Sequence, residues 1–415
     1  MKNRNLIIAI LGGLSTISPF AIDMYLPAFP EIATALHTTP AKVALSLSSY
    51  FAGIAAGQLC YGPLLDRWGR KLPLYAGLLV FILASLACLF AQRVETLIGL
   101  RFLQALGGCA AQVAAMALVR DLFPVHETAK VISLLVLVIS VSPLLAPSIG
   151  VMIATHLGWQ WLFIVLAAFV AIMMALTRQL LPSGRAPDER ISLRPAAILR
   201  NYGKVLREPQ FLTFALSGAF AFSGLLVYVA SSPLIFLEIF QVTQKQFGLI
   251  FAGLSLGFIG SNQANVLLLR KFSSEQILRG ALLAEGLATL LLLVGTTAGW
   301  FGLTTTLILL FIALASLGPA YPNAAALALV PFERNIGSAS ALLGFLQIGV
   351  AGLASASLGL FNSPTMLPVA AIFMVTAWIG LTIFGIGRKY LGQLRYATPE
   401  VPLKAIETTS VHVVD

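Results

Sequence analysis

Apolar stretches of about 17 to 25 residues recur along the whole chain, separated by short polar or Pro- and Gly-containing breaks. A helix of this length crosses the ~30 Å hydrocarbon core of a bilayer, and a spanning segment must satisfy its own backbone hydrogen bonds. The pattern predicts twelve membrane-spanning helices, an even number that places both chain ends on one side. The predicted spans are residues 6–27, 42–62, 73–91, 97–117, 130–154, 159–181, 211–235, 247–269, 277–298, 302–322, 337–361 and 366–387.

The composition supports a membrane protein and indicates its orientation. Only 10% of the residues are charged and 58% are apolar, whereas soluble domains average about 25% charged residues. With a cytoplasmic amino terminus, 22 of the 26 Lys and Arg residues lie on the cytoplasmic side, as the positive-inside rule requires. The net charge of +10 then belongs to loops that face anionic lipid headgroups, so nucleic-acid binding is not predicted. The four remaining basic residues are Lys42, Arg93, Arg101 and Lys245.

The order of the predicted spans divides the chain into two halves. We expect an all-α membrane protein with two pseudo-symmetric six-helix bundles, at residues 1–181 and 211–388. The polar segment 182–210 reads as a cytoplasmic linker with a short surface helix near 193–206, and 389–415 as a disordered cytoplasmic tail. Aligning Gly107 with Gly318 brings similar small residues at 114–119 and 325–330 opposite each other. This weak repeat is typical of two bundles that rock about a central site.

The most specific motif lies between the second and third predicted spans. Its residues are Gly62-Pro63-Leu64-Leu65-Asp66-Arg67-Trp68-Gly69-Arg70-Lys71. We expect Gly62 and Gly69 to permit a tight turn with close backbone approach, Asp66 to accept hydrogen bonds, and the basic residues to stay in the cytoplasm. The alternative is a basic turn that serves only to fix the orientation of the chain in the membrane. The segment resembles the G-x-x-x-D-R-x-G-R-R/K signature of the major facilitator superfamily.

That resemblance implies a function for the motif. In the family this loop latches the two halves while the carrier is open outward. Gly62, Asp66, Arg67, Gly69, Arg70 and Lys71 would then form the latch, with Asp66 capping the start of the eleventh span near Gly337.

Further segments resemble one branch of the family. Residues 100–108 are similar to its span-four motif, and residues 142–150 to its span-five antiporter motif, with Pro147, Gly150 and Ala146 in place of the usual glycine. Residues 20–27, 119–121, 231–233, 246–248 and 337–344 resemble the Bcr/CflA drug:proton antiporters. The resemblance implies a monomeric exporter of small amphipathic compounds in the bacterial inner membrane, driven by protons. The alternative is a proton-coupled importer or facilitator of a single small solute with the same fold.

Ionisable residues inside predicted spans are costly and mark transport pathways. Asp23 and Arg101 are both predicted about 6 Å below the outer surface, so they can form a pair that loosens when Asp23 binds a proton. A permanent ion pair between two helices is the alternative. For Glu285, in the ninth span, we favour a structural partner or a lipid-side water defect over a second proton site.

Polar and aromatic residues in the spans suggest a cavity lining, although interhelical hydrogen bonds explain many of them equally well. Span two faces the path in the family, which favours Tyr50 and Phe51. The candidate lining residues are Tyr25, Tyr50, Phe51, Gln112, Tyr228, Asn262, Asn265, Tyr321, Asn323 and Gln347. The cysteines Cys60, Cys88 and Cys109 lack the spacing of metal ligands, and the sequence has no nucleotide loop or nucleophile-base arrangement. We therefore predict a transporter without enzymatic activity, cofactor or metal.

Overall fold

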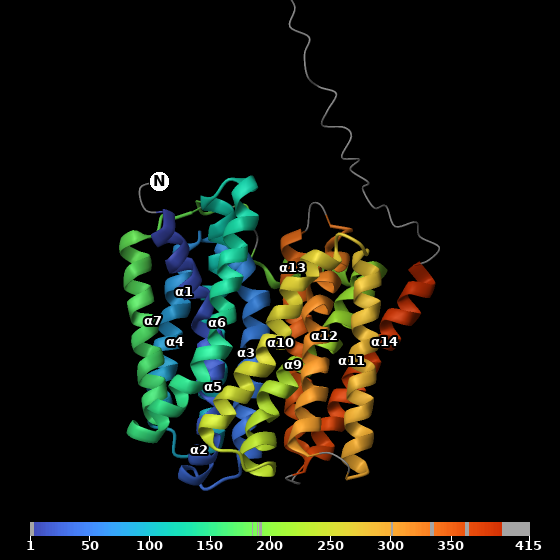
Figure 1. Ribbon diagram of the computed structural model, residues 1–415. Coiled ribbons are helices and arrows are strands. Elements are labelled where there is room, and N and C mark those ends of the chain that lie inside the picture. Colours follow the sequence, from blue (N-terminus) through green and yellow to red (C-terminus); the bar gives the residue numbers. More distant parts are fainter. Residues whose placement is uncertain are drawn as a thin grey trace, which may run out of the picture.

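The computed structural model describes residues 4–391 except 185, 189, 191, 192, 300, 301, 333–335 and 362–364; within the described helix Val125–Leu157 some side chains are also left out, as is that of Ile336. Two helical bundles lie side by side (Figure 1). The first contains α1 (Arg4–Asp23), η1 (Leu26–Ala28), α2 (Phe29–Ala35), α3 (Pro40–Arg67), α4 (Lys71–Cys88), α5 (Val94–Leu122), α6 (Val125–Leu157) and α7 (Gln160–Leu180). After α8 (Pro195–Leu206), the second contains α9 (Pro209–Pro233), η2 (Leu234–Ile239), α10 (Gln244–Leu268), α11 (Ser274–Thr297), α12 (Leu303–Leu329), α13 (Ile336–Ser357), η3 (Leu358–Leu360) and α14 (Met366–Leu391).

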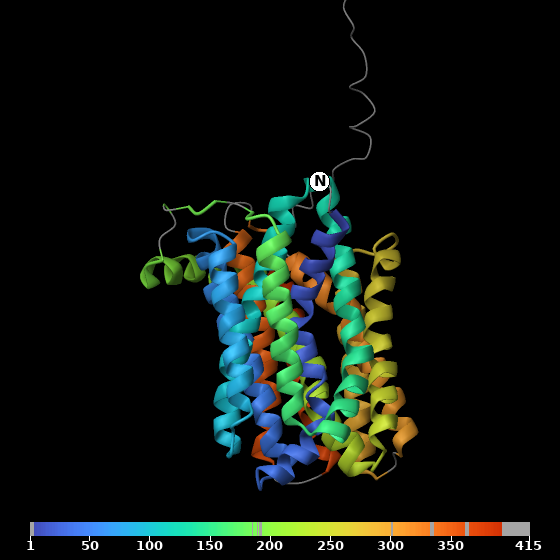
Figure 2. The same cartoon turned by 90° about the vertical axis from the view of Figure 1, so that its left-hand side faces the viewer.

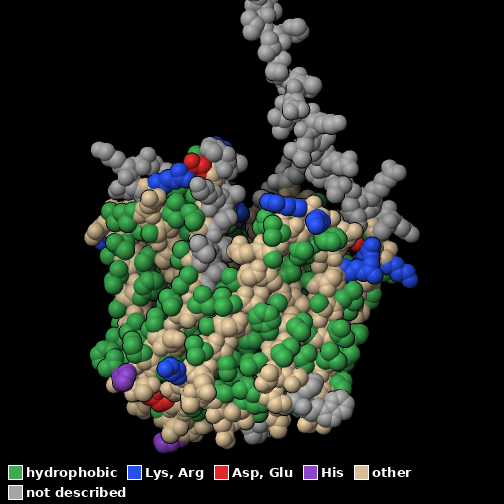
Figure 3. All heavy atoms as spheres, viewed as in Figure 1, with side chains coloured by type: hydrophobic (Ala, Val, Ile, Leu, Met, Phe, Trp, Pro, Cys, Tyr) green, Lys and Arg blue, Asp and Glu red, His purple; other side chains and the backbone are tan. Residues whose placement is uncertain are grey.

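The prediction of an all-helical membrane fold is confirmed. Among the described residues, 11 helices are long and apolar enough to cross a membrane. The 33-residue α6 adds an apolar stretch, Val141–Leu157, within its described part. Each predicted span therefore corresponds to one long helix, and large hydrophobic side chains cover the flank of the molecule (Figure 3).

The two ends of the bundles differ in charge. We call the end at which α1 begins and α14 ends the linker face, and the end that carries α2 the opposite face (Figure 1). Lys and Arg side chains gather at the linker face (Figure 3). There α8 lies across the helix direction beside the bundle (Figure 2), anchored by the Tyr202 hydroxyl, which donates to the Leu59 carbonyl at 3.0 Å.

Two helix ends differ from the prediction, and both differences affect the candidate site. Helix α3 begins at Pro40, where the Thr39 hydroxyl accepts from the Lys42 backbone N–H at 3.3 Å, and it continues to Arg67. Most of the predicted motif loop is therefore helical. Helix α1 stops at Asp23 rather than at residue 27, because the 3-10 turn at Leu26–Ala28 follows with Pro27 inside it.

The bundles touch near the opposite face and leave a cavity near the linker face. On the α3–α13 seam, the Ser48 and Ser355 hydroxyls hydrogen-bond at 2.9 Å, and Gly352 lies against Phe51. At the linker face, a cavity of about 510 Å³ separates Asp66 and Arg70 of the first bundle from the start of α13. The two bundles are thus in contact near the opposite face and separated near the linker face.

Candidate functional site

Arg101 is fully buried near the opposite face, and among the described residues no carboxylate pairs with it. Its guanidinium group donates to the Gln104 side-chain oxygen and, at 2.9 Å, to the backbone carbonyl of Ala21. The rings of Tyr25 and Tyr50 lie 4.4 Å and 4.3 Å from the guanidinium carbon. Cation–π contacts of this kind stabilise a desolvated cation by about 2 kcal/mol. A buried positive charge is therefore compatible with this site.

The end of α1 explains why the Ala21 carbonyl is available. The Tyr25 backbone N–H bonds Ile22 at 3.3 Å instead of closing a regular helical bond to Ala21. The Ala21 carbonyl is thus one of the acceptors that a helix leaves unpaired at its C-terminus. Arg101 satisfies this carbonyl, and its positive charge also complements the negative end of the α1 dipole.

Asp23 is 5% exposed, and its carboxylate accepts a hydrogen bond from the Ser142 hydroxyl of α6 at 3.1 Å. It forms no ion pair with Arg101, so the direct pair expected from the sequence is not made. The reason is geometric. Asp23 is the last residue of α1, whereas α5 begins at Val94 instead of residue 97, so Arg101 lies deeper in its helix than expected and meets the Ala21 carbonyl. Side chains two positions apart on a helix also point about 200° apart.

The span-five motif packs directly on this end of α1. Ser142, Ala146 and Gly150 are four residues apart and share one face of α6, and all three are buried. A side chain at Gly150 would collide with the backbone carbonyl of Met24. The motif therefore positions Asp23 by one hydrogen bond and by close backbone contact.

The second bundle reaches the same place through Tyr228 of α9. Its ring stacks on Phe251 with centroids 5.5 Å apart, and it lies within electrostatic range of Asp23. Buried polar atoms without a hydrogen bond are found here: the hydroxyls of Tyr50 and Tyr228, and Nε of Arg101. In folded proteins such groups usually indicate an additional water or ligand.

The latch motif forms an ionic cluster within the first bundle. Arg70 donates to Asp66 at 2.6 Å and to Asp121 of α5 at 2.7 Å, and it is 7% exposed. Burial by itself lowers the pKa of Arg70. Its hydrogen bonds with Asp121 and Asp66 outweigh this effect, so the pKa of Arg70 is raised. The cluster joins the ends of α3, α4 and α5 at the linker face.

One geometric expectation for this motif is wrong, and another stays untested. Gly69 does make the tight turn, with φ of 77°. Gly62 instead lies inside α3 with nothing within 4 Å of an added Cβ, so it serves neither a turn nor a close approach. Asp66 binds Arg70, and the cavity at the linker face separates Asp66 from Gly337. The cap on α13 is expected only while the carrier is open outward, so it stays a prediction. Arg67 and Lys71 are partly buried beside the cluster.

The candidate lining residues fall into different environments. Gln112 lines the linker-face cavity, and Gln347 is buried with an unpaired side-chain nitrogen. Asn323 donates to Asn265 at 2.7 Å, joining α12 to α10, which is the interhelical alternative raised for such residues. Tyr321 is 37% exposed and packs on Phe222, while the Asn262 backbone contacts Gly318. Tyr25, Tyr50, Phe51 and Tyr228 surround the Arg101 site or the seam between the bundles.

Glu285 lies inside the second bundle at 1% exposure. Its Oε2 has no hydrogen-bond partner, and its Oε1 lies 3.3 Å from where a side chain at Gly224 of α9 would begin. Leu317 and Phe373 are also near Gly224. Glu285 therefore does not face lipid, and among the described residues its Oε2 lacks the structural partner expected from the sequence.

Sequence reasoning missed the residues that hold the site together. Ser142 binds Asp23, Gln104 links Arg101 to the Ser85 hydroxyl at 2.7 Å, and Ser46 bonds the Tyr25 hydroxyl at 2.8 Å. Ser142 and Gln104 both belong to the recognised span-five and span-four motifs. The polar residues of these two motifs were therefore the feature of the sequence that could have identified the partners of Asp23 and Arg101.

Comparison with known proteins gives a consistent family. The model of the Major Facilitator Superfamily matches residues 11–355. YdgK of Bacillus subtilis, described as an uncharacterized MFS-type transporter, is 32% identical and covers 94% of this chain and 98% of its own. The bicyclomycin resistance protein homolog of Haemophilus influenzae is 31% identical, with 92% of this chain and 95% of its own covered. The multidrug resistance protein MdtL of Salmonella heidelberg is 31% identical over 80% and 82%.

Solved structures support the fold. A D-xylose–proton symporter superposes with a TM-score of 0.72 at 15% identity, covering 91% of this chain and 97% of its own. A partially occluded inward-open form of the xylose transporter XylE from E. coli gives 0.73 at 12% identity, covering 93% and 98%. At this identity the likeness concerns the fold alone. Both the matching family model and the near full-length relatives lead to one conclusion: the chain belongs to the major facilitator superfamily and is a multi-pass membrane transporter, not an enzyme.

Proposed function

We propose that this transporter exports small amphipathic compounds in exchange for protons, with Asp23 as the proton carrier. The observation that carries the proposal is the environment of Asp23: a buried carboxyl group with a neutral hydroxyl donor and, among the described side chains, no ion pair. Such a group can gain or lose a proton without breaking a fixed ion pair. The relatives described as bicyclomycin resistance and multidrug resistance proteins support export as the direction.

The last turn of α1 provides a coupling route in place of the direct Asp23–Arg101 pair. Asp23 ties this turn to α6 through Ser142, and the Ala21 carbonyl ties it to α5 through Arg101. A hydrogen bond to an ionised carboxylate is roughly twice as strong as one between neutral groups. Protonation of Asp23 therefore weakens its bond to Ser142, and the turn can shift relative to α6 and to Tyr228.

Alternating access then follows from the difference between the two faces. In the structure the bundles touch near the opposite face and part at the linker face. We infer that the linker face is cytoplasmic and that both termini lie there, in the inner membrane of a bacterium. The concentration of Lys and Arg at this face supports the orientation (Figure 3). Each chain carries both bundles, so a monomer is sufficient for transport.

Proton release on drug addition tests the exchange. Proteoliposomes containing the intact chain should release protons when an amphipathic drug is added, and Asp23→Asn should lose this release by about 100-fold while still folding. Glu95→Gln is the matched control, because Glu95 is an exposed acid at the same face. Proton release that survives in Asp23→Asn contradicts the proposal.

Drug susceptibility separates export from import of a single solute. Cells that express the chain should tolerate several unrelated amphipathic drugs better than control cells, and a proton uncoupler should remove this tolerance. Unchanged susceptibility across a broad panel favours the importer.

A further inference from the structure

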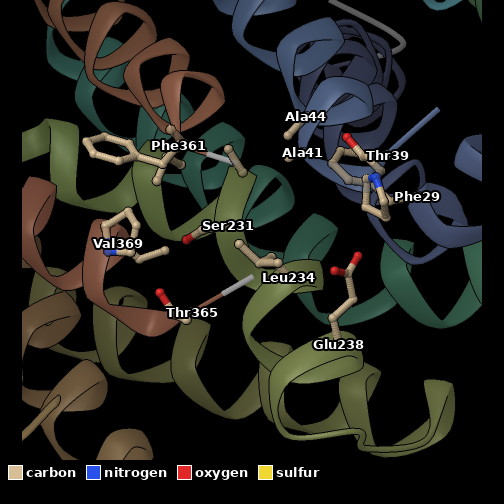
Figure 4. A pocket seen from close by; sticks show the side chains of 14 residues that line it. Phe29, Thr39, Ala41, Ala44, Ser231, Leu234, Glu238, Phe361, Thr365 and Val369 are labelled. Carbon is tan, nitrogen blue, oxygen red and sulfur yellow. The ribbon is translucent and has the colours of Figure 1, made fainter. Parts of the chain in front are cut away.

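A second cavity lies between the bundles near the opposite face, away from Arg101. Its volume is about 340 Å³. The first bundle contributes Phe29, Ala41 and Ala44 to its wall, and the second contributes Leu234, Phe361 and Val369 (Figure 4). The wall is thus mainly apolar, and its volume lies within the range of about 300–1,000 Å³ for small-molecule sites.

Glu238 brings a negative charge to this apolar cavity. In Figure 4 its carboxyl group extends from η2 toward the space between Leu234 and Phe29. Its Oε1 is buried, and Glu238 makes no hydrogen bond or ion pair in the described structure. Other polar side chains on the wall are engaged: Thr39 accepts from Lys42, and Ser231 donates to Val227. Glu238 is therefore available to a ligand.

The local backbone explains this direction. Pro233 ends α9 and has no N–H to donate, and the following segment Leu234–Ile239 is a π-helix. The Phe240 backbone N–H accordingly bonds Ile235 at 3.0 Å, five residues back. A π-turn inserts an extra residue and rotates the side chains after it, and such turns are frequent at functional sites.

We propose that this cavity is a second ligand site, specific for a compound with an apolar body and one positively charged nitrogen. Glu238 is partly buried, and its buried Oε1 atom favours a charged or hydrogen-bonding partner. Lys42, one residue beyond Ala41, is exposed and forms no ion pair with Glu238. Among the described residues none supplies a cation to Glu238, so we assign this role to the ligand, and the apolar wall accommodates the rest of the molecule.

The location of the site gives it a consequence for transport. Because its wall comes from both bundles, a bound cation holds the opposite face closed, and opening of that face removes half of the site. Resting on the proposed export function, the site is then the last position that an exported cation occupies before release. The binding itself does not depend on proton exchange.

A pair of matched probes tests the site: 5-phenylpentylamine, which is a cation at neutral pH, and its uncharged counterpart 5-phenylpentan-1-ol. Binding to the full chain in lipid nanodiscs is measured by calorimetry, with empty nanodiscs as background. Glu238→Gln should weaken binding of the amine by about tenfold or more, because a charge-assisted contact is lost. Binding of the alcohol should not change.

Two further variants locate the effect. Glu95→Gln removes an exposed acid at the same face, outside the cavity, and should leave both probes unaffected. Ala44→Leu fills the cavity from the first bundle and should weaken both probes. Equal amine affinity for Glu238→Gln and the intact chain, or equal losses in Glu238→Gln and Glu95→Gln, overturns the proposal. Unchanged binding of both probes to Ala44→Leu would show that they do not bind in this cavity.

The same variants keep the two proposals distinct. If Asp23→Asn still exchanges protons but Glu238→Gln loses amine binding, the exchange mechanism fails and the second site stands. If exchange requires Asp23 but Glu238→Gln binds the amine normally, only the second site fails.

Discussion

Asp23 and Glu285 are both buried acids in membrane helices, yet their surroundings differ. Asp23 sits where α1 ends, with α6 donating to its carboxylate and Tyr228 of the other bundle nearby. Glu285 lies in the interior of a single bundle, and its Oε2 has no donor. Insertion scales assign a charged residue at the centre of a membrane helix a cost of about 3 kcal/mol. The proposed coupling role of Asp23 therefore depends on its position between the bundles, because burial is common to both acids.

The end of α1 is the more demanding region, because it also holds a buried cation. Arg101→Met keeps a long side chain but removes the charge and all donors, which leaves the Ala21 carbonyl and the Gln104 oxygen unpaired. We expect the free energy of unfolding to fall by about 3 kcal/mol and transport to be lost. Thermal unfolding in detergent and proteoliposome transport measure the two effects.

Arg93→Met is the control for the loss of a positive charge, since Arg93 is exposed at the same face. It should change stability by less than about 0.5 kcal/mol. Equal stability of the Arg101 and Arg93 variants would mean that the contacts of Arg101 contribute nothing to the fold.

The contact between α6 and α1 can be disturbed without touching a charge. Gly150→Ala places a methyl group against the Met24 carbonyl, which must move. We expect a loss of about 1–3 kcal/mol in unfolding free energy and a several-fold slower exchange, because the turn that carries Asp23 is displaced.

Gly260→Ala in α10 is the matched control, because nothing lies within 4 Å of an added Cβ there. It should stabilise the helix by about 0.5–1 kcal/mol. Transport by Gly150→Ala at the rate of Gly260→Ala would show that close packing on Met24 is unnecessary for coupling.

The sequence was sufficient to predict the helices but not the pairing of the charges. Span length and apolar content determine that a segment crosses the membrane, and both are local properties. Whether Arg101 meets Asp23 depends on where α1 ends and on the relative depth of α1 and α5, and an error of a few residues in a helix end changes both. The sequence placed Asp23 before the end of its helix, and the structure places it at the end. The neighbouring carbonyl of Ala21 became the partner of Arg101 as a result.

Glu285 offers the smallest expected effect and the sharpest test of the comparison. Glu285→Gln keeps the shape of the side chain, and Oε2 has no hydrogen bond that the amide would lose. We expect transport to remain unchanged and the unfolding free energy to change by less than about 1 kcal/mol. Glu285→Leu should be as stable or more stable, because an unsatisfied buried polar group costs about 1–3 kcal/mol. Asp23→Asn, assayed alongside, should stop exchange at comparable stability. Loss of coupling in Glu285→Gln would instead make Glu285 a second proton site, and proximity to the seam between the bundles would no longer separate the two acids.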